Sequence, residues 1–297
     1  MCSRCNVTMK ISKRTKRHPR VVRSVPALRR AIAHFRTCGR TIALVPTMGA
    51  LHEGHFSLVR RAQSRTDCVI VSIFVNPTQF APDEDLTTYP RTLAADIAAL
   101  AERHVALVWA PSVQTMYPDG FATRVVPGEP AGVGLEDVSR PHFFAGVATV
   151  VAKLLIQCEP DIALFGEKDY QQLKVVTQLC RDLALKTRIV GAPIVRERDG
   201  LALSSRNRYL SPAERQAAPM LYRTLKEAAA KIGAGAPIAE ALKHARQAIP
   251  AAGFELDYFE ARNADTLEPL KGPAGEPIRL LAAARIGATR LIDNIAV

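Results

Sequence analysis

Two histidines in H-x-x-H spacing are the first residues of the chain whose type and spacing suit phosphate chemistry. His52 and His55 lie in the segment 46–55, PTMGALHEGH, which follows the apolar run 41–45. Imidazole rings placed there can donate hydrogen bonds to a phosphoryl group whose negative charge grows during transfer. A purely local hydrogen-bonding role explains so short a motif equally well. The pair alone therefore leaves chemistry and structure as open alternatives.

The elements on either side of the motif predict where the histidines lie. The run 41–45 is typical of a buried strand, and residues 56–62 continue as a helix, so the motif forms the turn between them. A helix that begins after the carboxyl end of a parallel strand directs its unpaired N–H groups and its positive dipole end toward a crevice. Gly49 and Gly54 let the backbone approach a bulky ligand. This arrangement suits a bound phosphate.

Strands that alternate with helices over the first two thirds of the chain predict an α/β fold with a doubly wound parallel sheet. The strands are expected at 41–45, 68–75, 105–109 and 161–165, and the helices between them include 93–103 and 146–157. A continuous apolar run such as 68–75 is typical of a strand that is covered on both faces. The first large part of the chain is therefore expected to be Rossmann-like.

The last hundred residues have a different pattern. They predict two Ala-rich helices and three short strands, at 212–232, 237–249, 255–261, 279–284 and 290–295. We therefore predict three parts. These are a basic, disordered extension at 1–22, a Rossmann-like domain at 23–194, and a smaller α+β domain at 195–297.

The net charge of +12 comes from one end of the chain. Residues 1–40 contain twelve Lys or Arg and no Asp or Glu, so the remainder carries 28 basic and 28 acidic residues. This balance gives the remainder no general attraction for nucleic acid. A nucleic-acid-binding protein is thus a competing prediction through the extension 1–22 alone. A targeting peptide is another alternative for that extension, and Met9 is an alternative start of the chain.

The cysteines and the hydropathy pattern indicate a reducing, aqueous compartment. Of the six cysteines, Cys2 and Cys5 form a C-x-x-C pair, and no second pair or nearby His pair in the sequence completes a zinc set. No apolar run approaches the roughly 18 residues that span a bilayer. We therefore expect a cytoplasmic protein without a membrane partner.

Two amide side chains follow the predicted strand 68–75. Asn76 and Gln79 can orient hydroxyl and carboxylate groups through directional hydrogen bonds. An Asn-Pro turn with ordinary side-chain capping is the alternative explanation.

A second polar group, GEKDYQQ at 166–172, follows the predicted strand 161–165. Here Lys168 can neutralise phosphate charge, Asp169 can face a ribose or a magnesium ion, and Gln172 can hold a substrate one turn later. A solvated helix N-terminus is the alternative, because acidic residues are favoured there in any case.

A third group stands at the predicted domain junction, where Ser204, Ser205 and Arg206 follow Gly200. Two hydroxyls and a guanidinium in a mobile loop can clamp a phosphate. Such a string alone is usually a surface loop. The combination is more informative, because each group lies where a doubly wound sheet would place a nucleotide site.

Five blocks of this sequence, in this order, resemble the pantoate–beta-alanine ligase (pantothenate synthetase) family. The blocks are PTMGALHEGH at 46–55, FVNPTQF at 74–80, YPRT at 89–92, FGEKDYQQ at 165–172 and SSRN at 204–207. The resemblance covers about residues 22–297. A set of blocks in order is far more specific than any single motif.

The resemblance implies a two-step ligation that uses ATP and Mg²⁺. The carboxylate of pantoate attacks the α-phosphorus of ATP, and the amine of beta-alanine then displaces AMP from the pantoyl adenylate. The smaller domain would act as a lid that keeps water from this intermediate. The family also implies a homodimer whose ligands are small molecules, without a nucleic-acid partner.

The resemblance assigns roles residue by residue. It implies that the catalytic residues are His52, His55, Lys168, Ser204, Ser205 and Arg206, with His55 as the proton donor. It implies that the ATP-binding residues are Pro46, Thr47, Met48, Gly49, Gly54, His55, Gly166, Glu167, Lys168, Asp169, Val195, Leu203, Ser204, Ser205 and Arg206. Pantoate would be bound by Gln79 and Gln172, with Asn76 assisting. No residue is assigned as a metal ligand.

The sequence departs from the family pattern at three positions. Phe143 occupies the place of the usual histidine, and His142 precedes it. Thr78 and Leu203 each stand where methionine is common. The first departure bears on any polar contact of that segment, so Phe143 and His142 are left out of the predicted site.

A different nucleotidyltransferase of the same architecture is the alternative function. It would attach a nucleotide to a phosphorylated acceptor, and the H-x-x-H turn alone does not separate the two. Gln79, Gln172 and the adjacent Lys168 and Asp169 favour a small hydroxy acid as the acceptor.

Overall fold

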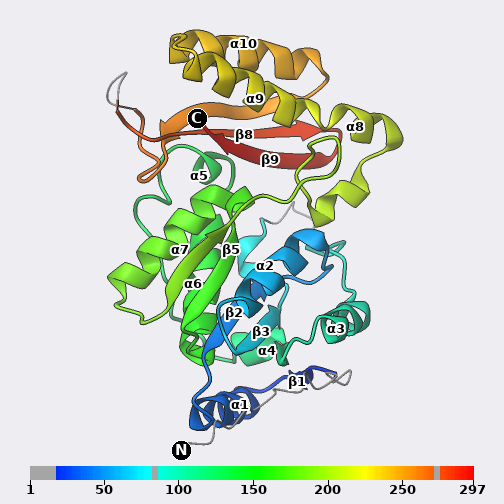
Figure 1. Cartoon of the computed structure of the whole chain (residues 1–297), viewed down its shortest axis with the longest axis vertical. Coiled ribbons are helices and arrows are strands. Elements are labelled where there is room, and N and C mark those ends of the chain that lie inside the picture. The colour runs from blue at the N-terminus through cyan, green and yellow to red at the C-terminus, as the bar shows by residue number, and fades with distance from the viewer. Residues whose placement is uncertain (1–17, 82–85, 271–274) are drawn as a thin grey trace, which may run out of the picture.

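The larger part of the chain is built around a six-stranded parallel sheet (Figure 1). The computed structural model describes residues 18–81, 86–270 and 275–297. The strands lie in the order β1-β4-β3-β2-β5-β6, and each neighbouring pair is parallel. Their bounds are Arg20–Val22 (β1), Ile42–Thr47 (β2), Cys68–Ile73 (β3), Leu107–Trp109 (β4), Ile162–Gly166 (β5) and Arg188–Ala192 (β6). This order confirms the doubly wound α/β fold.

Helices cover both faces of this sheet. Helices α1, α6 and α7 contribute to one apolar cluster, and α2 and α3 contribute to another. The two clusters take alternate residues of β3, with Ile70 in the first and Val71 in the second. The uninterrupted apolar run in the sequence is therefore explained by burial on both faces. The bounds are Val25–Thr37 (α1), Glu53–Gln63 (α2), Leu93–Glu102 (α3), Val113–Met116 (α4), Glu136–Ser139 (α5), Phe143–Cys158 (α6) and Tyr170–Asp182 (α7).

The last part of the chain forms a three-stranded antiparallel sheet with helices on its outer face (Figure 1). Helices α9 and α10 pack on this sheet around an apolar cluster of their own. The opposite face contributes Leu281 to a small cluster with Leu135 of the larger part. The bounds are Pro212–Ala217 (α8), Met220–Gly233 (α9), Ile238–Ala251 (α10), Glu255–Asn263 (β7), Ile278–Ile286 (β8) and Thr289–Ala296 (β9).

Within the described ranges, three short 3₁₀ turns lie at the ends of strands or in the connection between the sheets. They are Pro77–Gln79 (η1), Glu167–Asp169 (η2) and Ser205–Tyr209 (η3). Each carries residues of a sequence motif. These turns therefore place the predicted polar groups.

The apolar clusters separate near the predicted domain boundary. The two clusters of the parallel sheet draw on residues 22–192, and the cluster of the antiparallel sheet draws on residues 201–291. The division at 194 and 195 stays a prediction. No helix among the described residues combines the length and apolar character needed to cross a bilayer.

Two expectations about local structure are wrong. The extension 1–22 was expected to be disordered, but Arg20–Val22 forms β1 and pairs with Leu107–Trp109 of β4. The basic composition gives no sign of this short edge strand, which is stabilised by its pairing with β4. The helix expected at 212–232 is divided into α8 and α9, because Pro219 has no N–H group to continue the hydrogen bonding. Residues 1–17 of the extension lie outside the described residues.

Candidate active site

A cavity of about 730 Å³ lies beyond the carboxyl ends of β2 and β5. These strands are neighbours in the sheet, but β2 leads to β3 on one side and β5 leads to β6 on the other. The loops that follow them therefore separate, as they do at ligand crevices in doubly wound sheets. Residues of β9 line the cavity from the smaller sheet.

Most of the predicted site residues line this cavity. They are Pro46, Thr47, Met48, His52, Gly54, His55, Asn76, Gln79, Gly166, Lys168, Asp169, Gln172, Val195, Leu203, Ser204, Ser205 and Arg206.

Among the described residues that were predicted for the site, Gly49 and Glu167 do not line the cavity. Gly49 adopts a φ of +86° and lines an adjoining pocket. The Glu167 carboxylate lies 3.4 Å from the Arg279 guanidinium. Consecutive residues of a tight turn point in different directions, so neighbours within a motif do not all reach the same space.

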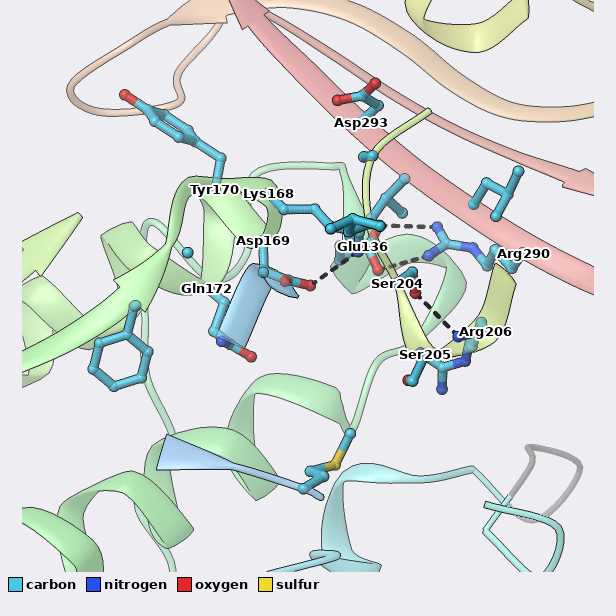
Figure 2. A pocket seen from close by; sticks show the side chains of 18 of the residues that line it. Glu136, Lys168, Asp169, Tyr170, Gln172, Ser204, Ser205, Arg206, Arg290 and Asp293 are labelled. Carbon is cyan, nitrogen blue, oxygen red and sulfur yellow. Dashed lines mark hydrogen bonds and ion pairs between the residues drawn. The ribbon is translucent and has the colours of Figure 1, made fainter. Parts of the chain in front are cut away.

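Figure 2 shows side chains from both parts of the chain around one space. Lys168 and Gln172 come from η2 and the start of α7, and Ser204, Ser205 and Arg206 approach from the other side. Lys168 is close enough that its charge lowers the pKa of both His52 and His55. The structure therefore brings together the motifs after β2 and β5 and the motif that precedes α8.

The two histidines cap the first turn of α2 through their Nδ1 atoms, so the Nε2 atom of each ring is not used in the cap. Nδ1 of His52 accepts a hydrogen bond from the Gly54 N–H at 3.2 Å, and Nδ1 of His55 accepts from the His52 N–H at 3.3 Å. A neutral ring whose Nδ1 is an acceptor carries its proton on Nε2. Because both rings line the cavity, each has an Nε2–H group as its donor for a ligand. The local role is therefore observed, and it leaves a donor on each ring for the predicted chemical role.

Burial keeps both rings neutral. It is the largest cause that lowers the pKa of His52 to about 4, followed by the charges of Lys168 and Arg208. Burial likewise lowers the pKa of His55 to about 3, followed by His52 and Lys168. A neutral imidazole donates a hydrogen bond without releasing a proton. A neutral His55 ring is suited to donate a hydrogen bond, and the role of proton donor that the resemblance implies for it stays a prediction.

Acidification from pH 7 to pH 5 is expected to destabilise the fold through these histidines. An unfolded imidazole binds a proton near pH 6.5, whereas the folded rings bind one near pH 4 and pH 3. Between these values the unfolded state holds more protons. The free energy of unfolding therefore decreases as the pH decreases, by up to about 1.4 kcal/mol per pH unit for each ring.

Urea unfolding at pH 7, 6 and 5 measures this dependence. The double variant His52→Gln/His55→Gln should show a shallower slope than the wild type, because glutamine does not titrate. Equal slopes would contradict the lowered pKa values.

Asp96 of α3 fixes the turn that leads to the histidines. Its carboxylate is buried and accepts hydrogen bonds from the N–H groups of Ala50 at 3.1 Å and Leu51 at 2.9 Å. The hydroxyl of Thr92 donates to it at 3.1 Å. Sequence reasoning missed this residue, because the backbone N–H groups that it holds lie more than forty residues away. The available signal was a carboxylate within an otherwise largely apolar helix.

The Asn76 amide holds Gln79 rather than facing the cavity with free hydrogen-bonding groups. Its Nδ2 donates to Oε1 of Gln79 at 3.1 Å and to the Gly146 carbonyl at 3.2 Å. Its Oδ1 accepts from the Tyr117 hydroxyl at 2.7 Å. The Nε2 group of Gln79 is left facing the weakly accepting sulfur of Met48 at 3.1 Å. Gln79 therefore keeps a donor for a ligand, and Asn76 acts by orienting it.

The start of α6 packs directly against η1. A Cβ atom on Gly146 would lie 2.8 Å from the Gln79 nitrogen and still closer to the Thr78 carbonyl. Both are backbone atoms, so η1 would have to move. Close approach of the backbone is therefore the reason for glycine at this position.

If Gln79 binds a substrate as predicted, Gly146→Ala is expected to lower kcat/KM for that substrate, on the order of 10- to 100-fold, because η1 is displaced. Steady-state kinetics with that ligand varied checks this. Alanine is otherwise favoured in a helix interior, so a loss cannot be assigned to helix propensity. Gly233→Ala at the end of α9, where a Cβ meets no atom within 4 Å among the described residues, is the matched control. Unchanged kinetics in Gly146→Ala would contradict the proposed packing role.

Phe143 supports an arginine at the same end of the cavity. Its ring is buried, and the Arg140 guanidinium stacks on it with 3.8 Å between the central carbon and the ring centroid. Arg140 also donates to the Gln79 carbonyl at 3.1 Å. His142 is exposed. The departure from the family pattern thus replaces a polar side chain with an aromatic surface for a cation.

A buried ionic cluster lies on the cavity wall between the two parts of the chain (Figure 2). The Glu136 carboxylate accepts from both terminal nitrogens of Arg290, at 2.8 and 2.9 Å, and from the Tyr258 hydroxyl at 2.8 Å. Nε of Arg290 donates to Asp257 at 2.6 Å. Burial, with the adjacent Glu136 charge as the second cause, raises the pKa of Tyr258 well above its usual value. Sequence reasoning missed this cluster, because no local pattern links these residues.

The sequence matches the family model for pantoate-beta-alanine ligase over residues 20–296. The chain belongs to the pantoate-beta-alanine ligase family. It is 60% identical over 281 residues to a pantothenate synthetase of Rhodopseudomonas palustris, with 95% of this chain and 99% of the relative covered. A pantothenate synthetase of Bradyrhizobium sp. is 61% identical over the same length and the same shares of the two chains.

Solved structures of the pantoate-beta-alanine ligase family have the same fold. The pantothenate synthetase of Thermus thermophilus superposes with a TM-score of 0.88 at 47% identity, covering 93% of this chain and 98% of its own. A pantoate-beta-alanine ligase of Francisella tularensis, described as complexed with beta-gamma ATP and beta-alanine, gives 0.77 at 35% identity, covering 94% and 97%.

Membership in the pantoate-beta-alanine ligase family confirms the predicted function. The chain is a ligase that condenses pantoate with beta-alanine. The alternative of a nucleotidyltransferase for a phosphorylated acceptor is set aside.

Proposed function

We propose that the ligation is ATP-dependent and passes through pantoyl adenylate, with (R)-pantoate and beta-alanine giving pantothenate, AMP and diphosphate. One observation carries this proposal. The neutral His52 and His55 rings lie on the same cavity as Lys168 and within reach of its charge, while Gln79 lines that cavity with a donor to spare. A phosphate site and a site for a small hydroxy acid therefore adjoin.

In the first step an oxygen of the pantoate carboxylate forms a bond to the α-phosphorus. The bond from that phosphorus to the bridging oxygen breaks, and diphosphate leaves with the electron pair. Negative charge grows on the phosphate oxygens as this happens. The Nε2–H groups of His52 and His55 and the charges of Lys168 and Arg206 stabilise that charge in place.

In the second step the uncharged amine of beta-alanine attacks the acyl carbon of pantoyl adenylate. The bond from carbon to the adenylate oxygen breaks, AMP leaves, and the amine gives up a proton. The acyl adenylate is exposed to hydrolysis unless water is excluded. The smaller domain, which closes one side of the cavity, supplies that exclusion as a lid.

The remaining site residues take their proposed roles from their places on the cavity. The backbone of 46–55 borders the adenylate, and Gln79 and Gln172 hold pantoate. Gln172 suits this role because the described part of the chain contains no hydrogen-bond partner for its amide. The nucleotide is bound by Gly166, Lys168, Asp169, Val195, Leu203, Ser204, Ser205 and Arg206.

The relative from Francisella tularensis supports the ligands, because its structure is described as a complex with beta-gamma ATP and beta-alanine. At 35% identity and nearly full coverage it is a member of the same family. We carry ATP and beta-alanine from that protein to the cavity of this chain.

Mg²⁺ fits the site as an ion that is bound mainly through the nucleotide. The described residues contain no group of three His, Cys, Asp or Glu side chains that could hold a metal alone. Mg²⁺ commonly binds through one carboxylate and substrate phosphates. Asp169, which lines the cavity and is partly exposed, would hold it. The ion would neutralise phosphate charge.

We also propose a cytoplasmic homodimer that binds small molecules and neither nucleic acid nor membrane. The balanced charge of the chain after residue 40 supports the absence of a nucleic-acid surface. Light scattering of the purified chain tests the dimer.

An assay that omits each component in turn tests the proposed mechanism. Diphosphate release should require ATP, Mg²⁺ and pantoate. Exchange of labelled diphosphate into ATP should occur with pantoate in the absence of beta-alanine, and AMP should be released at the full rate when beta-alanine is added. Exchange that requires beta-alanine would contradict the adenylate intermediate.

A further inference from the structure

Asp293 and Asn294 are neighbouring buried residues near the end of β9. They are 4% and 2% exposed, and both line the cavity. Figure 2 shows Asp293 on β9 beside the space that Lys168 enters. Buried polar groups inside a strand require partners. Their partners include the turn that carries Lys168 and the segment that leads to Ser204.

Asn294 holds the backbone of the turn that carries Lys168. Its Nδ2 donates to the carbonyls of Glu167 and Lys168, each at 2.9 Å. Its Oδ1 accepts from Nε of Arg279 at 2.8 Å. Both N–H bonds and the oxygen of the amide are thus used, which fixes the side chain. The turn η2 is only three residues long, so its conformation depends on such outside partners.

Asp293 holds the segment that leads to Ser204. Its carboxylate accepts two hydrogen bonds from the Arg196 guanidinium, at 2.6 and 2.8 Å. Arg196 also donates to the Gly200 carbonyl at 3.0 Å and forms a backbone bridge with Ala202. The chain between these residues is therefore fixed to β9 just before the Ser204 hydroxyl.

The two contacts are linked to each other. The backbone N–H of Asn294 donates to the Asp293 carboxylate at 2.7 Å. One dipeptide on a strand of the smaller sheet thus contacts a turn of the larger domain and the connection between the domains. Charge stabilisation during phosphoryl transfer requires donors that are held in place before reaction.

We infer that Asn294 is a positioning residue that aims Lys168 at the nucleotide phosphates, and that Asp293 beside it sets the Ser204–Arg206 segment in register with Lys168. This rests on the proposed role of Lys168 in binding ATP. β9, which carries the dipeptide, belongs to the smaller domain that is proposed to act as the lid. Closure of that domain and placement of Lys168 are therefore coupled.

Asn294→Asp tests the inference. The shape and the acceptor for Arg279 remain, but a carboxylate oxygen replaces the donor to two carbonyls and repels them. We expect kcat/KM for ATP in pantoate-dependent diphosphate formation to fall about 10- to 100-fold, with little change in KM for beta-alanine. Asn294→Ala, which also removes the donor, is expected to behave alike and replaces the first variant if that one does not fold.

Asn263→Asp is the matched control, because it makes the same change on β7 of the same sheet. Its Nδ2 donates to Glu276 and its Oδ1 accepts from the Asp265 and Thr266 N–H groups, and it does not line the described cavity. It should lower the thermal midpoint and leave kcat and KM of the folded protein unchanged. If Asn294→Asp lowered the thermal midpoint but left kcat and KM unchanged, the inference would be overturned.

A double-mutant cycle with Lys168→Ala separates the inference from the proposed function. If Asn294 acts through Lys168, Asn294→Asp should change kcat/KM for ATP less than about 2-fold in the Lys168→Ala background. A full additional loss there would overturn the inference. Full activity of Lys168→Ala itself would instead contradict the proposed role of the lysine.

Discussion

His55→Ala is expected to lower pantoate-dependent diphosphate formation by about 100- to 1,000-fold. The neutral ring carries its proton on Nε2 and lines the cavity beside His52. Alanine removes this donor where charge develops on the α-phosphate. Because the pKa of His55 is about 3, the ratio of wild-type to variant rates should stay constant between about pH 6 and pH 8. A stopped assay of diphosphate at each pH measures both effects.

His55→Gln is the control for the structural role of the same ring. His55 is also the N3 acceptor of the α2 capping box. Glutamine is a usual residue at that position, so it retains an acceptor for the His52 N–H. The free energy of unfolding of this variant should therefore lie within about 1 kcal/mol of the wild-type value. Its rate of diphosphate formation should stay close to that of His55→Ala. If His55→Ala were destabilised but formed diphosphate at the normal rate, His55 would have only the structural role of a helix cap.

The fold was largely predictable, because its signals are local and repeated. The runs 42–46 and 68–71 are apolar throughout, and the first is followed by helix α2, which has one apolar face. Burial on both faces of a parallel sheet requires that pattern. The error at β1 occurred where a contact distant in sequence decided the structure, because this strand is held by its pairing with β4. The error at Pro219 was local, because a proline that breaks the hydrogen bonding lies within an otherwise helical pattern.

The candidate site was predictable as a set of motifs, but its supporting residues were not. His52, Gln79 and Lys168 follow strands, and the topology alone brings them to one edge of the sheet. Asp96 and Asn294 act on backbone groups that are 45 or more and about 126 residues away. Such hydrogen bonds require neither a residue pattern nor a spacing, so a single sequence carries no sign of them.

The supporting residues share one physical feature. The turns that carry His52 and Lys168 are too short to satisfy their own backbone groups, and a buried side chain from another element satisfies them. Asp96 accepts from N–H groups before His52, and Asn294 donates to carbonyls at Lys168. Strand ends thus place the reactive side chains approximately, and these buried partners fix their direction.

Glu136→Ala is expected to lower the free energy of unfolding by about 3–5 kcal/mol, the largest stability effect that we predict. Arg290 and Tyr258 would lose their shared partner, although Asp257 still accepts from Arg290. The Glu136 and Arg290 side chains are only 8% and 15% exposed, so water cannot fully replace the lost contacts. Urea denaturation measures the loss. A separate, earlier unfolding step of the smaller domain is expected as well, because the cluster joins the two domains.

Asp265→Ala is the matched control, since it also breaks an ion pair between the two domains. Lys174 and Asp265 are 3.4 Å apart, but the Asp265 side chain is 77% exposed. Removal of this pair should cost less than about 1 kcal/mol. Equal, small losses for Glu136→Ala and Asp265→Ala would show that the buried cluster does not hold the domains together.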